Sequence, residues 1–202
     1  MEIKDIYKKL IKYRFSLGLC LVGGALLGII FYFMPSKYVA VGSFFVNRKI
    51  SPENSFFTYE GYYGQQTALT YTNSVLSLMG SIDIRKMVLE SNKIPPTSKN
   101  MNILNRAIRV TKTGPQVILL TVKANTYEDA KRLWNSVSNV TVATAFEINS
   151  NGDENLSISP VSPQPLVGIP YKSIYLYGIV GALVSLTLAS FFVCLKEYFK
   201  SN

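Results

Sequence analysis

The sequence of 202 residues offers few side chains for catalysis, because it has no histidine and only two cysteines. Catalytic triads that need histidine and His-ligated metal sites are therefore excluded, and two cysteines cannot form a Cys-rich zinc site or a disulfide scaffold. Adjacent carboxylates occur at Glu128-Asp129 and Asp153-Glu154. The first pair falls in the first turn of a predicted helix and the second in a predicted loop, which are ordinary structural places for acids. We expect no catalytic residue, no metal, no cofactor and no enzymatic activity.

The cations are more unevenly distributed than the acids. From Arg85 to Lys112 the chain carries seven Lys or Arg residues and one acid, Glu90. One interpretation is a basic surface for an anionic glycan, a pyrophosphate or a lipid headgroup. The other is a solvated face, since charged segments usually face water. The candidate residues for such a basic glycan or partner surface are Arg85, Lys86, Arg106 and Arg109.

The most apolar parts of the chain are two long runs. Residues 15–34 and 174–195 contain no charged side chain, and at 1.5 Å per residue each reaches about 30 Å, the thickness of the hydrocarbon core of a bilayer. Lysines flank both runs on their terminal sides. The positive-inside rule then predicts a two-pass membrane protein, with tails 1–14 and 196–202 in the cytoplasm and residues 35–173 on the other side.

The net charge of +9 follows the same division of the chain. The two tails carry nearly half of this surplus, and such charge is a signal of membrane topology rather than of a binding surface. We therefore expect membrane lipids, and not nucleic acid, as partners.

Small residues recur along both apolar runs at spacings that allow helix backbones to approach each other closely. Close packing of helices is one interpretation of this pattern. The other is that glycine is frequent in membrane helices in general. The candidate packing residues are Gly24, Gly28, Gly178, Gly181, Ala182, Ser185 and Ala189.

The pattern of residues 35–173 predicts a small α+β domain, with an antiparallel or mixed sheet packed with helices. Branched and aromatic residues indicate strands, apolar residues at helical spacing indicate helices, and Ser81 and Thr126 are expected N-caps. The expected strands are 38–46, 109–111, 117–122 and 156–161. The expected helices are 62–79, 82–91, 102–108 and one that runs from Thr126 to a break at 149–155, and residues 51–64 are expected to be a loop that leads into the first of them.

Several motifs, taken in their order along the chain, resemble the Wzz-type chain-length determinants, also called polysaccharide co-polymerases. A basic N-terminal tail and an apolar span precede Pro35-Ser36-Lys37-Tyr38-Val39-Ala40, which opens a strand. A tyrosine-rich helix carries Gln65-Gln66, and Thr126–Ala130 with Trp134-Asn135 follows a strand. The proline-rich approach to the second span consists of Pro160, Pro163, Pro165 and Pro170.

The resemblance implies a non-enzymatic regulator in the bacterial cytoplasmic (inner) membrane, with no kinase domain of its own. Such a protein forms homo-oligomers and acts with a separate polymerase that extends lipid-linked glycan. It sets the chain length of a polysaccharide, which could be an O-antigen, a capsule or an exopolysaccharide. Two transmembrane helices would flank the α+β domain.

The length of residues 35–173 leaves a second function open. The segment is short for the O-antigen members of the family and matches in size the small capsular adaptors. Those adaptors activate a separate cytoplasmic tyrosine kinase that controls synthesis and export of the polysaccharide. The alternative is therefore a membrane adaptor for such a kinase.

Overall fold

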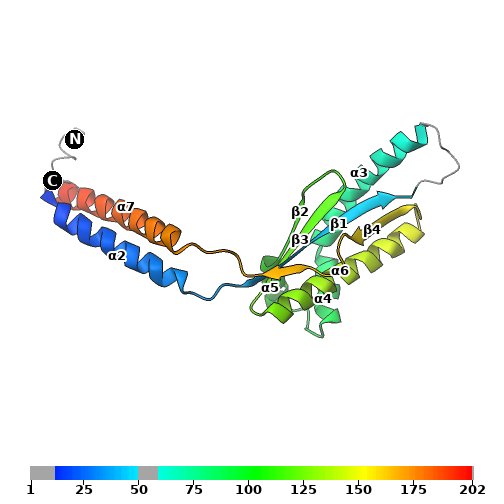
Figure 1. The fold of residues 1–202 in the computed structure, drawn as a ribbon, viewed down its shortest axis with the longest axis horizontal. Helices are drawn as coiled ribbons and strands as arrows, with labels where there is room; N and C mark the ends of the chain where they lie inside the picture. Colours follow the sequence, from blue (N-terminus) through cyan, green and yellow to red (C-terminus); the bar gives the residue numbers. More distant parts are fainter. Residues whose placement is uncertain (1–11, 50–58, 202) are drawn as a thin grey trace. The chain divides into compact units, whose positions relative to one another are not determined.

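The computed structural model describes residues 12–49 and 59–201, and these divide into two compact units (Figure 1). One unit comprises the two ends of the chain, up to Pro35 and from Tyr171 onward. The other is the continuous stretch Ser36–Pro170. Most of the expected N-terminal tail and residues 51–58 of the expected loop lie outside the described residues.

The first unit is a pair of helices, α2 (Arg14–Tyr32) and α7 (Ile174–Ser201), which lie side by side (Figure 1). Both are long and apolar enough to cross a membrane, α7 over Ile174–Lys196. Large apolar side chains point outward from the pair, among them Leu19, which is 67% exposed, and Phe191, which is 60% exposed. A helix pair that is apolar on its outer surface fits a lipid environment better than water.

Glycines on α2 pack directly on the backbone of α7. A Cβ at Gly24 would lie 2.6 Å from the carbonyl oxygen of Gly181 and 2.0 Å from Ser185 Oγ. A Cβ at Gly28 would lie 2.2 Å from the Tyr177 carbonyl oxygen. The close packing considered for Gly24, Gly28, Gly181 and Ser185 is thus a contact within one chain. The other candidate packing residues contribute less: Gly178 faces Ile29 with ordinary space for a Cβ, and Ala182 and Ala189 are half-buried.

The second unit is an α+β domain with an antiparallel sheet, as expected. The sheet has the order β2-β3-β1-β4, and β5 pairs with β1 on the same edge as β4. The strands are β1 (Tyr38–Arg48), β2 (Ile108–Lys112), β3 (Val117–Ala124), β4 (Leu156–Pro160) and β5 (Leu166–Gly168). The helices are α3 (Tyr59–Gly80), α4 (Ile82–Ser91), α5 (Ser98–Ala107) and α6 (Tyr127–Ser150).

One face of this sheet forms the hydrophobic core. Alternate residues of β1 and β3, such as Phe44, Leu120 and Val122, are fully buried, and α3, α4 and α6 contribute apolar side chains to the same cluster. Trp134 of α6 stacks on Phe44 with ring centroids 5.6 Å apart. Residues of the opposite parity, such as Val41, point to the other face and remain partly exposed. The alternation in the sequence therefore corresponds to one covered and one open face.

The helix boundaries follow from capping side chains. The Ser81 hydroxyl accepts a hydrogen bond from the Ile84 amide at 3.3 Å, and Thr126 accepts one from the Asp129 amide at 3.1 Å, which confirms both expected N-caps. Thr97 caps α5 in the same way, so this helix begins four residues before the expected position. Helix α3 begins at Tyr59, inside the expected loop. Strand β5, between two prolines, was not expected.

Candidate functional site

The four cations considered for a basic surface do not share one site. Arg85 lies on α4 and donates from Nη1 to the side-chain oxygen of Asn105 on α5. Lys86, one residue further, pairs with Glu90 at 3.9 Å. Arg106 lies in the last turn of α5. Arg109 follows the buried Ile108 in β2 and points to the face of the sheet that is opposite the core.

Arg85 has the environment of a structural residue. Its side chain is only half-exposed, its Nε atom is buried without a hydrogen-bond partner in the described structure, and burial lowers the pKa of its guanidinium. Arg85 donates a hydrogen bond to Asn105, and a hydrogen bond made by a charged group contributes more than one between neutral groups. Arg85 therefore joins α4 to α5 through one of its guanidinium nitrogens.

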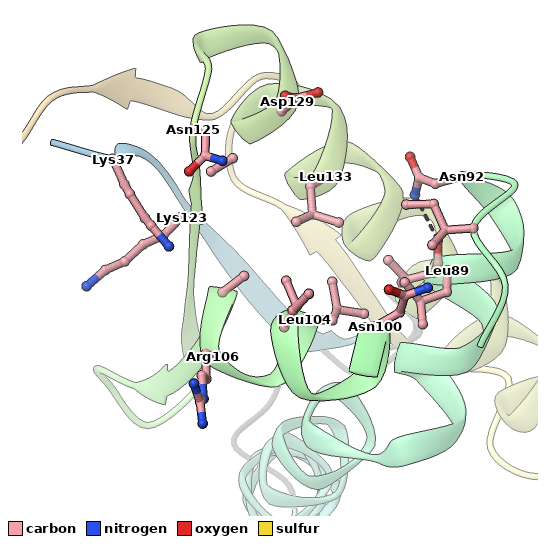
Figure 2. Close-up of a pocket in the computed structure, with 15 residues that line it drawn as sticks. Lys37, Leu89, Asn92, Asn100, Leu104, Arg106, Lys123, Asn125, Asp129 and Leu133 are labelled. Carbon is pink, nitrogen blue, oxygen red and sulfur yellow. Dashed lines mark hydrogen bonds between the residues drawn. The ribbon is translucent and has the colours of Figure 1, made fainter. Parts of the chain in front are cut away.

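Arg106 lines a cavity of about 290 Å³ between α4, α5, β3 and the start of α6 (Figure 2). The centre of the cavity is aliphatic, with Leu89, Leu104 and Leu133 converging from three helices (Figure 2). The complete aliphatic lining consists of Val88, Leu89, Ile94, Ile103, Leu104, Ala107, Ala124 and Leu133.

Three cations line one side of this cavity, Lys37, Arg106 and Lys123, and the ends of Lys123 and Arg106 point outward, away from the three leucines (Figure 2). We call the three cations the cationic rim. Lys123 is near the end of β3, and Lys37 immediately precedes β1, the strand that pairs with β3 through Tyr38 and Ala124. Arg106 is brought to the same side by the C-terminal turn of α5, where a cation also interacts favourably with the helix dipole.

Among the described residues of the lining the one acid is Asp129, and it is already engaged. Its Oδ2 accepts a hydrogen bond from the Thr126 hydroxyl at 2.8 Å, and its Oδ1 accepts one from Arg132 at 2.8 Å. Both carboxylate oxygens therefore accept hydrogen bonds from residues at the start of α6. Within residues 12–49 and 59–201, none of the three cations of the rim has an acidic partner within ion-pair distance. The rim consequently has an uncompensated positive charge.

Two asparagines hold the wall of the cavity opposite the cationic rim (Figure 2). The side-chain amide of Asn92 donates to the Val88 carbonyl at 2.8 Å, and that of Asn100 donates to the Pro95 carbonyl at 2.8 Å. These bonds fix the connection between α4 and α5. The wall is thus formed before any ligand arrives.

The prolines of the expected proline-rich segment lie elsewhere in this unit. Pro160 ends β4 opposite Phe44, Pro165 is buried just before β5, and Pro163 and Pro170 are exposed. None of them lines the cavity. Proline cannot donate a ladder hydrogen bond, so the segment forms two short edge strands rather than one long strand.

Sequence patterns indicated Arg106 but missed Lys37 and Lys123. The pairing of β1 with β3 would have revealed these two lysines, because the observed register brings the start of β1 beside the end of β3. That register depends on tertiary packing and could not be read from either strand alone.

No known protein family matches this sequence, and no curated protein is significantly similar to it. In the part of the chain that the structure describes, no group of three or more Cys, Asp or Glu side chains could hold a metal ion.

Proposed function

We propose that this chain is a two-pass protein of the bacterial cytoplasmic membrane that regulates the chain length of a polysaccharide. It would act without enzymatic activity of its own, as a homo-oligomer beside a separate polymerase that extends lipid-linked glycan. The observation that carries this proposal is the arrangement of the chain: two long apolar helices, α2 and α7, enclose in sequence a continuous α+β unit.

The outward surface of the helix pair supports a location in the membrane. Burying apolar side chains such as Leu19 and Phe191 in lipid removes a large unfavourable contact with water. The ends of the pair carry the amphipathic groups expected at a membrane surface. Lys12 and Lys196 both lie 5.9 Å from the ring centroid of Tyr13, and Lys172 donates to the Met34 carbonyl at 2.7 Å.

The cations at the terminal ends of the two helices support an orientation in the membrane. Lys12, Arg14 and Lys196 lie at the terminal ends of the two helices, which favours a cytoplasmic position for both termini. The α+β unit would then be extracytoplasmic. Labelling of single-cysteine variants by a membrane-impermeant reagent in intact cells tests this topology: a cysteine at exposed Ser162 should react, and one at Lys196 should not.

The function itself is tested by deletion and complementation. Deleting the gene should change the modal length of a cell-surface polysaccharide, measured on a gel that resolves single repeat units. The intact gene and the variant Gly168→Ala should restore it, because no described residue other than its two chain neighbours comes within 4 Å of a Cβ at Gly168. The variant Gly42→Ala, which overlaps the core, should not. An unchanged length distribution in the deletion strain would rule out this function.

The modest size of the α+β unit favours the kinase adaptor as the second candidate. Its longest helix, α6, has 24 residues and reaches about 36 Å at 1.5 Å per residue. No longer helix protrudes from the described part of this unit. Tyrosine phosphorylation of a co-produced cytoplasmic kinase, measured with and without this chain, distinguishes the two candidates. Loss of phosphorylation together with altered export would favour the adaptor.

A further inference from the structure

We propose that the cavity between α4, α5, β3 and α6 binds a phosphate group, with the cationic rim holding the phosphate and the aliphatic centre holding the carbon part attached to it. This ligand class is not specified by chain-length control, and the binding experiment below does not depend on that function.

The charge of the rim selects an anion. Lys37, Arg106 and Lys123 line one side of the cavity, and none has an acidic partner in the described structure. The ion-pair partner of Asp129 in the described structure is Arg132, and not one of these three cations. Three cations on one side favour a group with more than one negative charge, and the planar guanidinium of Arg106 can bind two phosphate oxygens together.

The lining also limits what can accompany the phosphate. Among the described residues no aromatic side chain lines the cavity, so this lining offers no stacking surface of the kind on which nucleobases and sugar rings are commonly held. The side chains at its centre, Leu89, Leu104 and Leu133, are aliphatic instead (Figure 2). A flexible aliphatic or glycerol group matches these surroundings.

The volume indicates how much of the ligand is enclosed. A cavity of about 290 Å³ lies at the lower end of the roughly 300–1,000 Å³ that small-molecule pockets usually have. A phosphate or pyrophosphate with a few attached carbons fits this space. A longer chain would have to leave through the mouth of the cavity, so binding would involve a headgroup and not a whole lipid.

Titration calorimetry on the full-length protein in an uncharged detergent tests the site. The probes are inorganic pyrophosphate, dihexanoyl phosphatidic acid and, as a zwitterionic reference, dihexanoyl phosphatidylcholine. Pyrophosphate and phosphatidic acid should bind, and phosphatidylcholine should bind at least tenfold more weakly than phosphatidic acid. Added salt should weaken the binding of both pyrophosphate and phosphatidic acid, since screening reduces the attraction between exposed charges.

The double variant Lys37→Gln/Lys123→Gln should lower the affinity for both phosphate probes at least tenfold. The matched control is Lys99→Gln/Lys131→Gln, which removes the same charge from α5 and α6 at positions that do not line the cavity. This control should change the affinity less than twofold. The proposal would be overturned if neither pyrophosphate nor phosphatidic acid bound. It would also be overturned if the two double variants weakened the binding of these probes equally.

A variant that fills the aliphatic part of the cavity distinguishes the two possible sources of the phosphate, a lipid headgroup and a soluble phosphate compound. Ala107 is half-buried in the lining, and Ala107→Leu occupies space there. If the natural ligand is a lipid headgroup, phosphatidic acid should bind tighter than pyrophosphate, and Ala107→Leu should remove that advantage while pyrophosphate still binds. If it is a soluble phosphate compound, both probes should bind equally, and Ala107→Leu should affect them equally.

Discussion

The indole ring of Trp134 occupies the space that a side chain at Gly42 would need. A Cβ at Gly42 would lie 2.3 Å from Trp134 Cζ2. Trp134 cannot easily move away, because it is 1% exposed, stacks on Phe44 and donates from Nε1 to the Leu120 carbonyl at 3.3 Å. The glycine in the middle of β1 is therefore a packing requirement of the core.

Gly42→Ala should destabilise the α+β unit by at least about 1–3 kcal/mol, the usual cost of inserting a carbon into a packed core. Trp134 is the single tryptophan of the chain, so its fluorescence reports unfolding of this unit directly. The thermal midpoint of the fluorescence transition should fall. Gly168→Ala, in a strand but with open space around it, is the control and should leave the midpoint nearly unchanged.

Gly28→Leu should separate α2 from α7, because any side chain at Gly28 collides with the Tyr177 carbonyl. The two native cysteines, Cys20 on α2 and Cys194 on α7, allow a direct measurement. Spin labels at these positions should give a longer or broader distance distribution in the variant. Gly23→Leu, on the same helix but without a neighbour within 4 Å, should keep the native distribution. An unchanged distribution in Gly28→Leu would mean that the glycine contact does not hold the pair together.

Thr126→Val should destabilise α6 by about 1 kcal/mol through loss of its N-cap. The threonine hydroxyl accepts from the Asp129 amide and donates to the Asp129 carboxylate. Valine has nearly the same shape but can do neither. Thr126→Ser keeps both bonds and should remain close to the native stability in a denaturant titration. Equal losses in the two variants would mean that the methyl group, and not the hydroxyl, matters.

Protonation of the Asp153 carboxylate should make the α+β unit less stable in acid. The hydrogen bond from Arg48, 2.9 Å long, lowers the pKa of the Asp153 carboxyl, against a smaller opposing effect of burial. A lowered pKa in the folded state stabilises the protein above the ordinary carboxyl pKa of about 3.9, and this stabilisation is lost as the pH falls through the lowered value.

Asp153→Asn should therefore cost about 0.2–1 kcal/mol at pH 7, the usual range for a pair near the surface. The cost should shrink as the pH falls through the lowered pKa of the Asp153 carboxyl, because the native side chain then becomes protonated and loses the charge that pairs with Arg48. Thermal midpoints of both proteins over this fall in pH measure the difference. Glu154→Gln, at the exposed neighbouring position, is the control. A constant gap between Asp153→Asn and the native protein at all pH values would contradict the ion-pair explanation.

Elements with a strong local pattern could be predicted from the sequence. The β2–β3 hairpin has branched residues on both sides of Thr113-Gly114-Pro115, and α6 has a capping threonine followed by an apolar stripe that includes Trp134 and Val137. Ser81 fixed the start of α4 for the same reason. In each case, side chains close in sequence form the contacts that define the element.

Elements that depend on distant partners were missed or misplaced. Strand β5 has three residues and exists only because it pairs with Val39–Val41 of β1. Helix α5 begins with polar Ser98-Lys99-Asn100, so its first turn has no apolar periodicity to reveal it. The cavity is the extreme case, since Lys37 and Lys123 are far apart in sequence and are brought to one rim by the register of β1 and β3.

The pairing of β1 with β5 has a mechanical consequence. β1 begins a few residues after α2 and β5 ends a few residues before α7, and Val39 pairs with Gly168. A force that drew the two apolar helices apart would pull on the same end of this antiparallel pair. The strands would then peel open one residue pair at a time, and only the three pairs of β5 would yield at first. Most of the longer β1–β3 ladder and the core beneath it would be loaded only after β5 had detached, so β5 would be the first strand of the α+β unit to yield.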